Sequence, residues 1–161
     1  MPQIIRIAGV SGSGKTTLIQ QILAECRGRN ISTACLKHSH HHLQLPEKDS
    51  TRLFQASSDG SMVIGGNAIS ITLPLMNKTP QEWSCFLFPE TDLVLVEGWR
   101  EHPLPTVLLT QNIVPEWKIP ERTIASVGEK MIFDIPSYPD AKTLIPFLFQ
   151  YLEQDELIKN Q

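Results

Sequence analysis

The chain has 161 residues, of which 41% are hydrophobic and 19% are charged, a composition typical of one compact α/β-sized domain that buries a core without disulfides or structural metal. Its 14 basic and 17 acidic residues give a formal net charge of −3, which argues against a nucleic-acid-binding surface because such a surface needs a basic excess. No apolar stretch fits a signal peptide or a membrane span. We therefore expect a single domain over residues 1–161, with no nucleic-acid or membrane partner.

The cysteines exclude two further classes of protein. Cys26, Cys35 and Cys85 form an odd set without C-x-x-C spacing, so neither a disulfide framework nor a zinc ribbon fits. Reduced thiols in a cytoplasmic protein are the interpretation that this pattern favours.

The first third of the chain predicts a strand, a helix and a second strand. Residues Gln3–Ala8 form an apolar run that ends at a glycine, which indicates a buried strand. Apolar residues at helical spacing predict a helix over Thr16–Cys26. Ile31–Leu36 is the second predicted strand, and after a histidine-rich loop a short helix is expected over Asp49–Ser57.

The middle of the chain predicts a hairpin followed by a helix. Ser61–Ile64 and Ala68–Leu73 are strand-like segments joined by a Gly-Gly-Asn turn. The segment Thr79–Glu82 has the form of a capping box with proline at the first helical position, so it should open a helix that reaches about Phe88.

The last part of the chain predicts three strands and a closing helix. Leu93–Val96 is a run of apolar residues typical of a strand covered on both faces. Thr106–Thr110 and Ile124–Val127 are further strands, and Asp140–Gln154 is an amphipathic helix. Strands that alternate with helices predict an α/β fold, with a mainly parallel sheet flanked by helices and an antiparallel hairpin insertion.

A phosphate-binding loop is the clearest motif. Residues 9–16 (G-V-S-G-S-G-K-T) match the pattern G-x4-G-K-[ST] between a predicted strand and a predicted helix. Glycines let successive amides face one anion, and the helix N-terminus adds its positive dipole end. Lys15 is placed to reach the β- and γ-phosphates, the Thr16 hydroxyl to ligate Mg²⁺, and Thr17 to donate to the α-phosphate. The motif predicts the nucleoside-triphosphate site of a P-loop NTPase.

A carboxylate is expected beside this loop. Asp92 precedes the strand Leu93–Val96 and Glu97 ends it. A residue at the carboxyl end of a parallel strand lies on the ligand edge of the sheet, so Glu97 is the predicted Mg²⁺ ligand, and Gly98 is expected to let the backbone approach the γ-phosphate. Asp92 is expected to cap the strand.

Four of the five histidines lie in residues 38–42, directly after a predicted strand. Three hypotheses stay open for His38, His40 and His41. The first is a transition-metal site, because imidazoles at i and i+2 share a face of an extended segment. The second is a loop that positions substrate or nucleotide, and the third is a solvated loop. Asp49 is a candidate for water positioning or for contact with the Mg²⁺ shell, and equally for the N-cap of the next helix. Ser126 and Gly128 are the candidates for contact with the base.

Four segments in order resemble the MobB family of molybdopterin-guanine dinucleotide biosynthesis adaptor proteins: residues 9–17, 36–41 (L-K-H-S-H-H), 48–50 (K-D-S) and 93–100 (L-V-L-V-E-G-W-R). The resemblance implies a P-loop GTPase of the signal-recognition and dethiobiotin-synthetase group. It further implies a homodimer that binds GTP with Mg²⁺, hydrolyses it slowly, and assists a molybdopterin guanylyltransferase and molybdenum-insertion proteins.

The resemblance also implies roles for particular residues. Phosphate contacts fall on Ser11, Gly12, Ser13, Gly14, Lys15, Thr16 and Thr17. Thr16 and Glu97 are implied as Mg²⁺ ligands, and His38, His41 and Asp49 as functional residues, with Glu97 or Asp49 positioning water for slow hydrolysis. The sequence departs from the family pattern at Trp99-Arg100, where lysine often follows the aromatic residue, and at His42, where an acidic residue is more frequent.

Three other functions stay open. The phosphate loop also occurs in small-molecule kinases, although the six arginines here (6, 27, 29, 52, 100 and 122) are scattered and form no paired lid. The histidine run motivates a metal-delivery GTPase that binds nickel or zinc. A scaffold that binds GTP without turnover is the third.

Overall fold

A computed structural model describes residues 1–39, 43, 49–57, 59–111, 118–130, 132 and 134–159, with side chains to residue 154 in the last helix. The contacts of the chain group into two compact units. One unit comprises Met1–His38 and Thr79–Gln161, and the other is Ser39–Lys78. The expectation of a single domain stays a prediction, and each unit is described by itself below.

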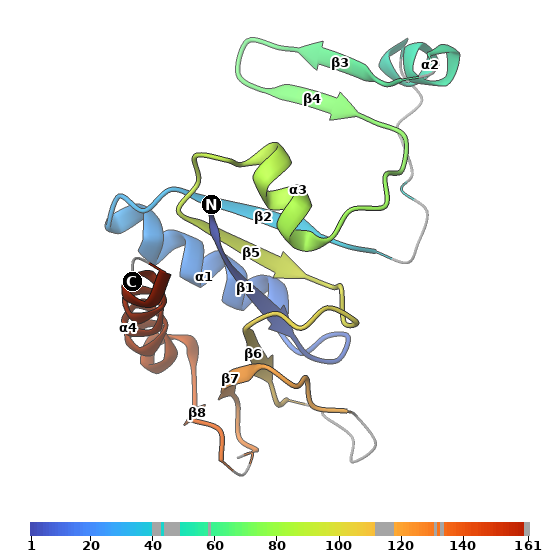
Figure 1. Cartoon of the computed structure of the whole chain (residues 1–161). Helices are drawn as coiled ribbons and strands as arrows, with labels where there is room; N and C mark the ends of the chain where they lie inside the picture. Colours follow the sequence, from blue (N-terminus) through green and yellow to red (C-terminus); the bar gives the residue numbers. More distant parts are fainter. Residues whose placement is uncertain are drawn as a thin grey trace. The chain divides into compact units, whose positions relative to one another are not determined.

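The larger unit is built on a six-stranded sheet with the order β2-β5-β1-β6-β7-β8 (Figure 1). All neighbouring strands are parallel, which confirms the predicted fold class. The strands are β1 (Gln3–Ala8), β2 (Thr33–Lys37), β5 (Leu93–Glu97), β6 (Thr106–Leu109), β7 (Thr123–Val127) and β8 (Ser137–Tyr138). Strand β8 was not among the predicted elements.

Strand β1 lies inside the sheet and buries both of its faces. Alternate residues of a strand point to opposite sides, so Ile5 and Ile7 enter one hydrophobic cluster while Ile4, on the other face, packs against a second. In β5 the same alternation sends Leu93 and Leu95 to the first cluster and Val94 and Val96 to the second. A strand covered on both sides has to be apolar along its length, which is why the run Leu93–Val96 could be predicted.

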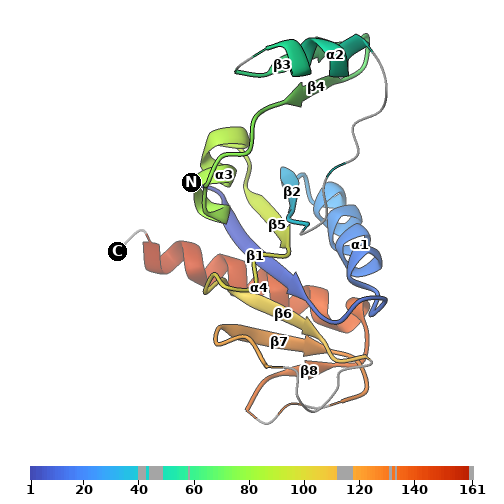
Figure 2. The same cartoon turned by 90° about the vertical axis from the view of Figure 1, so that its right-hand side faces the viewer.

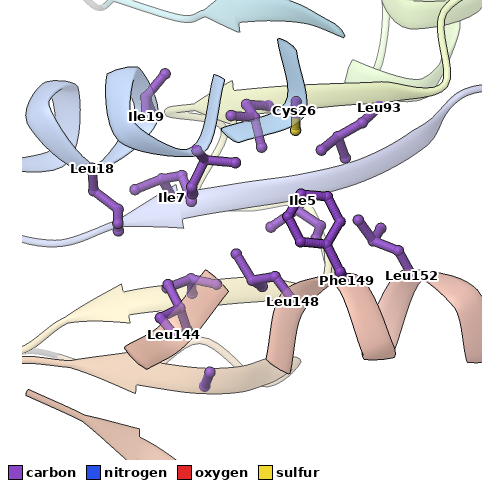
Figure 3. Packing of buried hydrophobic residues seen from close by; sticks show 14 of the residues in the cluster. Ile5, Ile7, Leu18, Ile19, Cys26, Leu93, Leu144, Leu148, Phe149 and Leu152 are labelled. Atoms are coloured by element: carbon purple, nitrogen blue, oxygen red, sulfur yellow. The ribbon is translucent and has the colours of Figure 1, made fainter. Parts of the chain in front are cut away.

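Helices cover both faces of this sheet. The first cluster joins the strands to α1 (Lys15–Gly28) and α4 (Ala141–Lys159), and Figure 3 shows the α4 side chains Leu144, Leu148 and Leu152 facing the strands. The second cluster includes Trp83 of α3 (Pro80–Leu87). None of the helices is long and apolar enough, within the described residues, to cross a membrane.

Helix α3 begins with the predicted capping box. The Thr79 backbone N–H donates to Glu82 Oε2 at 2.7 Å, and the Glu82 N–H donates to Thr79 Oγ1 at 3.2 Å. These two bonds satisfy N–H groups that a helix start leaves without partners. Pro80 occupies the first turn, where a missing N–H leaves no gap in the helical hydrogen bonds.

The smaller unit contains the predicted hairpin. Strand β3 (Ser61–Ile64) pairs antiparallel with β4 (Ile69–Thr72), in the register Ser61↔Thr72. Helix α2 (Asp49–Ala56) lies beside the hairpin (Figure 2). The hairpin exposes a group of apolar side chains that we call the hairpin surface: Met62, Val63, Ile64, Ile69 and Ile71.

A buried arginine ties the β5–β6 connection to the second face of the sheet. Arg6 of β1 is only 2% exposed. Its Nη1 donates to the carbonyl oxygens of Trp99 at 2.7 Å and His102 at 2.8 Å, and its Nε donates to Thr106 Oγ1 at 2.9 Å. A buried guanidinium needs such acceptors because burial removes its water. The connection between Gly98 and Pro105 is therefore held to β1 by the hydrogen bonds of Arg6.

Candidate nucleotide-binding site

The phosphate loop lies between β1 and α1, as the motif predicts. Gly9 stands where only a glycine fits: a Cβ atom there would lie 2.6 Å from Ser13 Oγ and 3.1 Å from Leu109 Cβ. Gly14, the residue before the helix, has a φ of 90°, a conformation that side chains disfavour. These two glycines allow the loop to pack closely, and the Ser13 side chain within it is buried, with 1% exposure.

Lys15 is the cation of this loop. Its Nζ donates to the carbonyl oxygens of Gly9 at 3.2 Å and Val10 at 2.8 Å, so the side chain folds back over the loop. Thr16 and Thr17 follow in the first turn of α1 and are exposed. The ammonium, the hydroxyl groups and the helix N-terminus thus come together at one end of the sheet, which is the arrangement that binds phosphate.

Glu97 ends β5 next to the strand that carries the phosphate loop. Its backbone is in register with Ile7 of β1 and with Lys37 of β2. The carboxylate oxygen Oε2 lies 3.5 Å from Lys37 Nζ, and the side chain is 18% exposed. Hydroxyl and carboxylate oxygens are the ligands that Mg²⁺ prefers, so the donor chemistry of Thr16 and Glu97 fits this ion.

Asp92 lies at the opposite end of β5. Its Oδ2 accepts hydrogen bonds from the backbone N–H and the hydroxyl of Ser32, both at 2.8 Å, and its own N–H donates to Ser32 Oγ at 2.9 Å. These bonds fasten the start of β5 to the residues before β2. Asp92 therefore caps the strand, which confirms the prediction.

Gly98 is required by the end of β2. Its φ is 104°, and a Cβ atom there would lie 2.7 Å from the His38 carbonyl oxygen and 2.8 Å from His38 Cβ. The His38 N–H donates to the Glu97 carbonyl oxygen at 2.8 Å, and the His38 ring stacks on Trp99 with centroids 4.8 Å apart. The close approach of two strand ends explains the glycine here. Its approach to a γ-phosphate stays a prediction.

The other candidates are His40 and His41 of the histidine run, and Asp49 of the smaller unit. His40 and His41, like His42, lie outside the described residues. Within the described part of the chain, no group of three His, Cys, Asp or Glu side chains is placed to hold a metal. Asp49 is the first residue of α2 in the smaller unit, with Oδ1 lying 3.6 Å from Arg52 Nη1. Its proposed contact with water or Mg²⁺ stays a prediction.

A pocket of about 460 Å³ lies where β6 and β7 end. Gly128, one of the two residues expected near the base, lines it, and a Cβ atom there would lie 2.6 Å from Thr110 Oγ1. The other, Ser126, is buried with its hydroxyl 2.8 Å from that of Ser137. The other lining residues could not be predicted from the sequence; they are Thr110, Gln111, Glu129, Lys130 and Pro139.

A parallel sheet whose inner strand leads into a glycine-rich loop and a helix defines the class of P-loop NTPases. Within this class, residues 4–128 match the family model described as "MobB: Molybdopterin guanine dinucleotide synthesis protein B". The chain belongs to the MobB family.

Curated relatives carry corresponding names. The chain is 40% identical over 114 residues to the molybdopterin-guanine dinucleotide biosynthesis adapter protein of Haemophilus influenzae, a match that covers 66% of this chain and 62% of that protein. It is 32% identical over 111 residues to the probable adapter protein of Bacillus subtilis, covering 66% and 64%. The match to the Escherichia coli adapter protein has 25% identity and covers 96% and 95%. The chain thus matches a little under two thirds of the length of the first two relatives.

Solved structures show the same fold. The crystal structure of Bacillus subtilis MobB matches with a TM-score of 0.70 and 27% identity, covering 92% of this chain and 97% of the other. A MobB homologue from Bacillus stearothermophilus matches with a TM-score of 0.65 and 18% identity, covering 94% and 98%. The second likeness concerns the fold alone.

Replacing Gly98 by alanine is expected to lower the free energy of unfolding by about 2 kcal/mol or more, because the new methyl group meets the His38 backbone and the positive φ disfavours a side chain. Gly28→Ala is the matched control, since nothing lies within 4 Å of a Cβ atom there. Urea denaturation of both variants measures the effect. Equal stability of Gly98→Ala and the wild type would contradict the packing described for the two strand ends.

Proposed function

We propose that this protein is a GTP-binding adaptor with slow intrinsic hydrolysis that assists the attachment of GMP to molybdopterin. The observation that carries the proposal is the phosphate loop of residues 9–16 in a chain that belongs to the MobB family. Its relatives are named molybdopterin-guanine dinucleotide biosynthesis adapter proteins. A molybdopterin guanylyltransferase and molybdenum-insertion proteins are the proposed partners, in the cytoplasm, where the three free thiols of this chain would stay reduced.

The proposed role of the loop is to bind the phosphates. Backbone N–H groups of Ser11–Thr17 surround the anion, and Lys15 turns its Nζ from the Gly9 and Val10 carbonyl oxygens to the phosphate oxygens. Thr16 and Glu97 would hold Mg²⁺, which when bound neutralises charge on the β- and γ-phosphates. Glu97 or Asp49 would orient the attacking water. Hydrolysis without a dedicated arginine is slow, because such an arginine raises the rate by about 10³–10⁵.

The pocket at the ends of β6 and β7 is the proposed base site. Guanine presents N–H donors at N1 and N2 and an acceptor at O6 on one edge, whereas adenine presents the opposite pattern there. The Glu129 carboxylate would accept both N–H groups, and the neighbouring Lys130 would donate to O6. This pairing favours GTP over ATP.

The hairpin surface is the proposed homodimer contact. Sheet β3–β4 has two strands within the described residues, and Ile64, Ile69 and Ile71 are 73%, 61% and 53% exposed. A lone two-stranded sheet is marginal in water, and grouped exposed apolar side chains mark contact surfaces. A second copy supplies the same strand by two-fold symmetry, which lets two identical edges pair antiparallel.

Lys15→Ala is expected to weaken GTP binding by about 10- to 100-fold, because hydrogen bonds to charged groups contribute about 1.5–3 kcal/mol. Isothermal titration calorimetry with GTP and Mg²⁺ measures the change. Lys142→Ala, an exposed lysine of α4, is the matched control and should bind as the wild type does. Unchanged affinity in Lys15→Ala would refute the phosphate site.

Glu129→Gln is expected to reduce the preference for GTP over ATP by about fivefold or more, since a two-point contact to a base edge contributes about 1–3 kcal/mol to discrimination. The ratio of the two dissociation constants is the measurement. Glu90→Gln, an exposed glutamate outside the pocket, should leave the ratio as it is. A ratio insensitive to Glu129 would place the base elsewhere.

Light scattering of the wild type is expected to give twice the chain mass of 18.1 kDa. The double variant Ile64→Lys and Ile69→Lys should give the monomer mass, because two buried charges would oppose the contact. Phe86→Lys serves as the control, since this residue is 55% exposed in the other unit. A wild-type mass of one chain, with and without GTP, would exclude the dimer.

A further inference from the structure

A second cavity lies on the other side of the molecule's central strand from α1 and α4. It has a volume of about 430 Å³ and is lined by Arg6 and Ala8 of β1 together with residues 100–103 and 118–121. Ile5 and Ile7 point the opposite way, into the cluster with the helices. None of these lining residues belongs to the phosphate loop or to the pocket at the ends of β6 and β7.

The guanidinium of Arg6 supplies a cation to this cavity. Its Nε and Nη1 are engaged by Thr106 and by backbone carbonyl oxygens. Within the described part of the chain, nothing accepts a hydrogen bond from Nη2, and no carboxylate forms a salt bridge with Arg6. A guanidinium is a rigid planar fork that binds an anionic oxygen pair well. A buried one that lines a cavity with donors to spare is therefore suited to an anionic ligand.

The walls of the cavity combine apolar surface with charged groups. Pro103, Ile119 and Pro120 give apolar surface, and Arg100 and Lys118 add positive charge. The carboxylates of Glu101 and Glu121 lie on the same lining, where they can accept from ring N–H groups. Ligand pockets in proteins combine apolar walls with polar groups that fix the orientation of the ligand, and this lining offers both.

We propose that this cavity binds a pterin that carries an anionic group, with the anion on Arg6 and Lys118 and the ring against Pro103 and Ile119. A 2-amino-4-oxo pterin ring has N–H donors that match the Glu101 and Glu121 carboxylates. The inference rests on the proposed function, because a role in attaching GMP to molybdopterin calls for a pterin-recognising surface in the complex. It assigns the pterin and the nucleotide to different sites on one chain.

The test uses the full chain and the fluorescent probe pterin-6-carboxylate, titrated first without nucleotide and then in the presence of saturating GTP and Mg²⁺. Saturable binding of one probe per chain is expected. Lys118→Ala should weaken it about tenfold or more, and Ile119→Trp should abolish it by filling the entrance. Both positions are exposed, so circular dichroism should show unchanged folding. Lys142→Ala is the matched control and should bind the probe as the wild type does.

Three results would overturn the inference: no saturable binding, binding unchanged in both cavity variants, or displacement of the probe by GTP. Displacement would mean that the ring sits in the proposed base pocket, and Glu129→Gln would then lose the probe. The two proposals fail separately. Lys15→Ala should bind GTP more weakly and bind the probe as the wild type does when GTP is omitted, while Lys118→Ala should bind the probe about tenfold more weakly and bind GTP as the wild type does.

Discussion

The hydrogen bonds of one buried guanidinium, that of Arg6, hold the connection between β5 and β6 against the sheet. Arg6 lies in the middle of β1, the strand that ends in the phosphate loop, and holds the carbonyl oxygens of Trp99 and His102. The segment that starts beside Glu97 is thus fixed to the strand that leads into the phosphate loop and Lys15. Burial lowers the pKa of the Arg6 guanidinium, and the charge of Glu101 acts in the opposite direction. Arginine stays a cation within such shifts, so its hydrogen bonds to the Trp99 and His102 carbonyl oxygens persist.

The elements that could be predicted are those whose cause is local. The capping box of Thr79 and Glu82 uses residues three apart, and the apolar run Leu93–Val96 predicts a strand covered on both sides. Strand β8 could not be found in this way. It has only two residues, and its backbone is a strand because β7 lies beside it.

In the candidate site, too, the residues that could be predicted are those with a local cause in the sequence. Lys15 and Glu97 followed from a motif and from the rule that strand ends meet the ligand edge. Gly128 was expected near the base and lines the pocket, but Thr110 could not be added from the sequence, because it meets Gly128 only through the pairing of β6 with β7. Arg6 is visible in the sequence as a single charge inside an apolar strand. Its role could not be predicted, because the carbonyl oxygens that it binds belong to Trp99 and His102, far away in the sequence.

The order of strands also decides when the phosphate loop can take shape. Strand β1 pairs with no strand that is near it in sequence: Gln3 is in register with Leu93, and Ala8 with Leu108. Contacts between distant residues form late, because a long loop has to close first. During synthesis from the N-terminus the loop is among the first segments to be made. The strand that carries the loop nevertheless gains its two sheet neighbours only after β5 and β6 have been made.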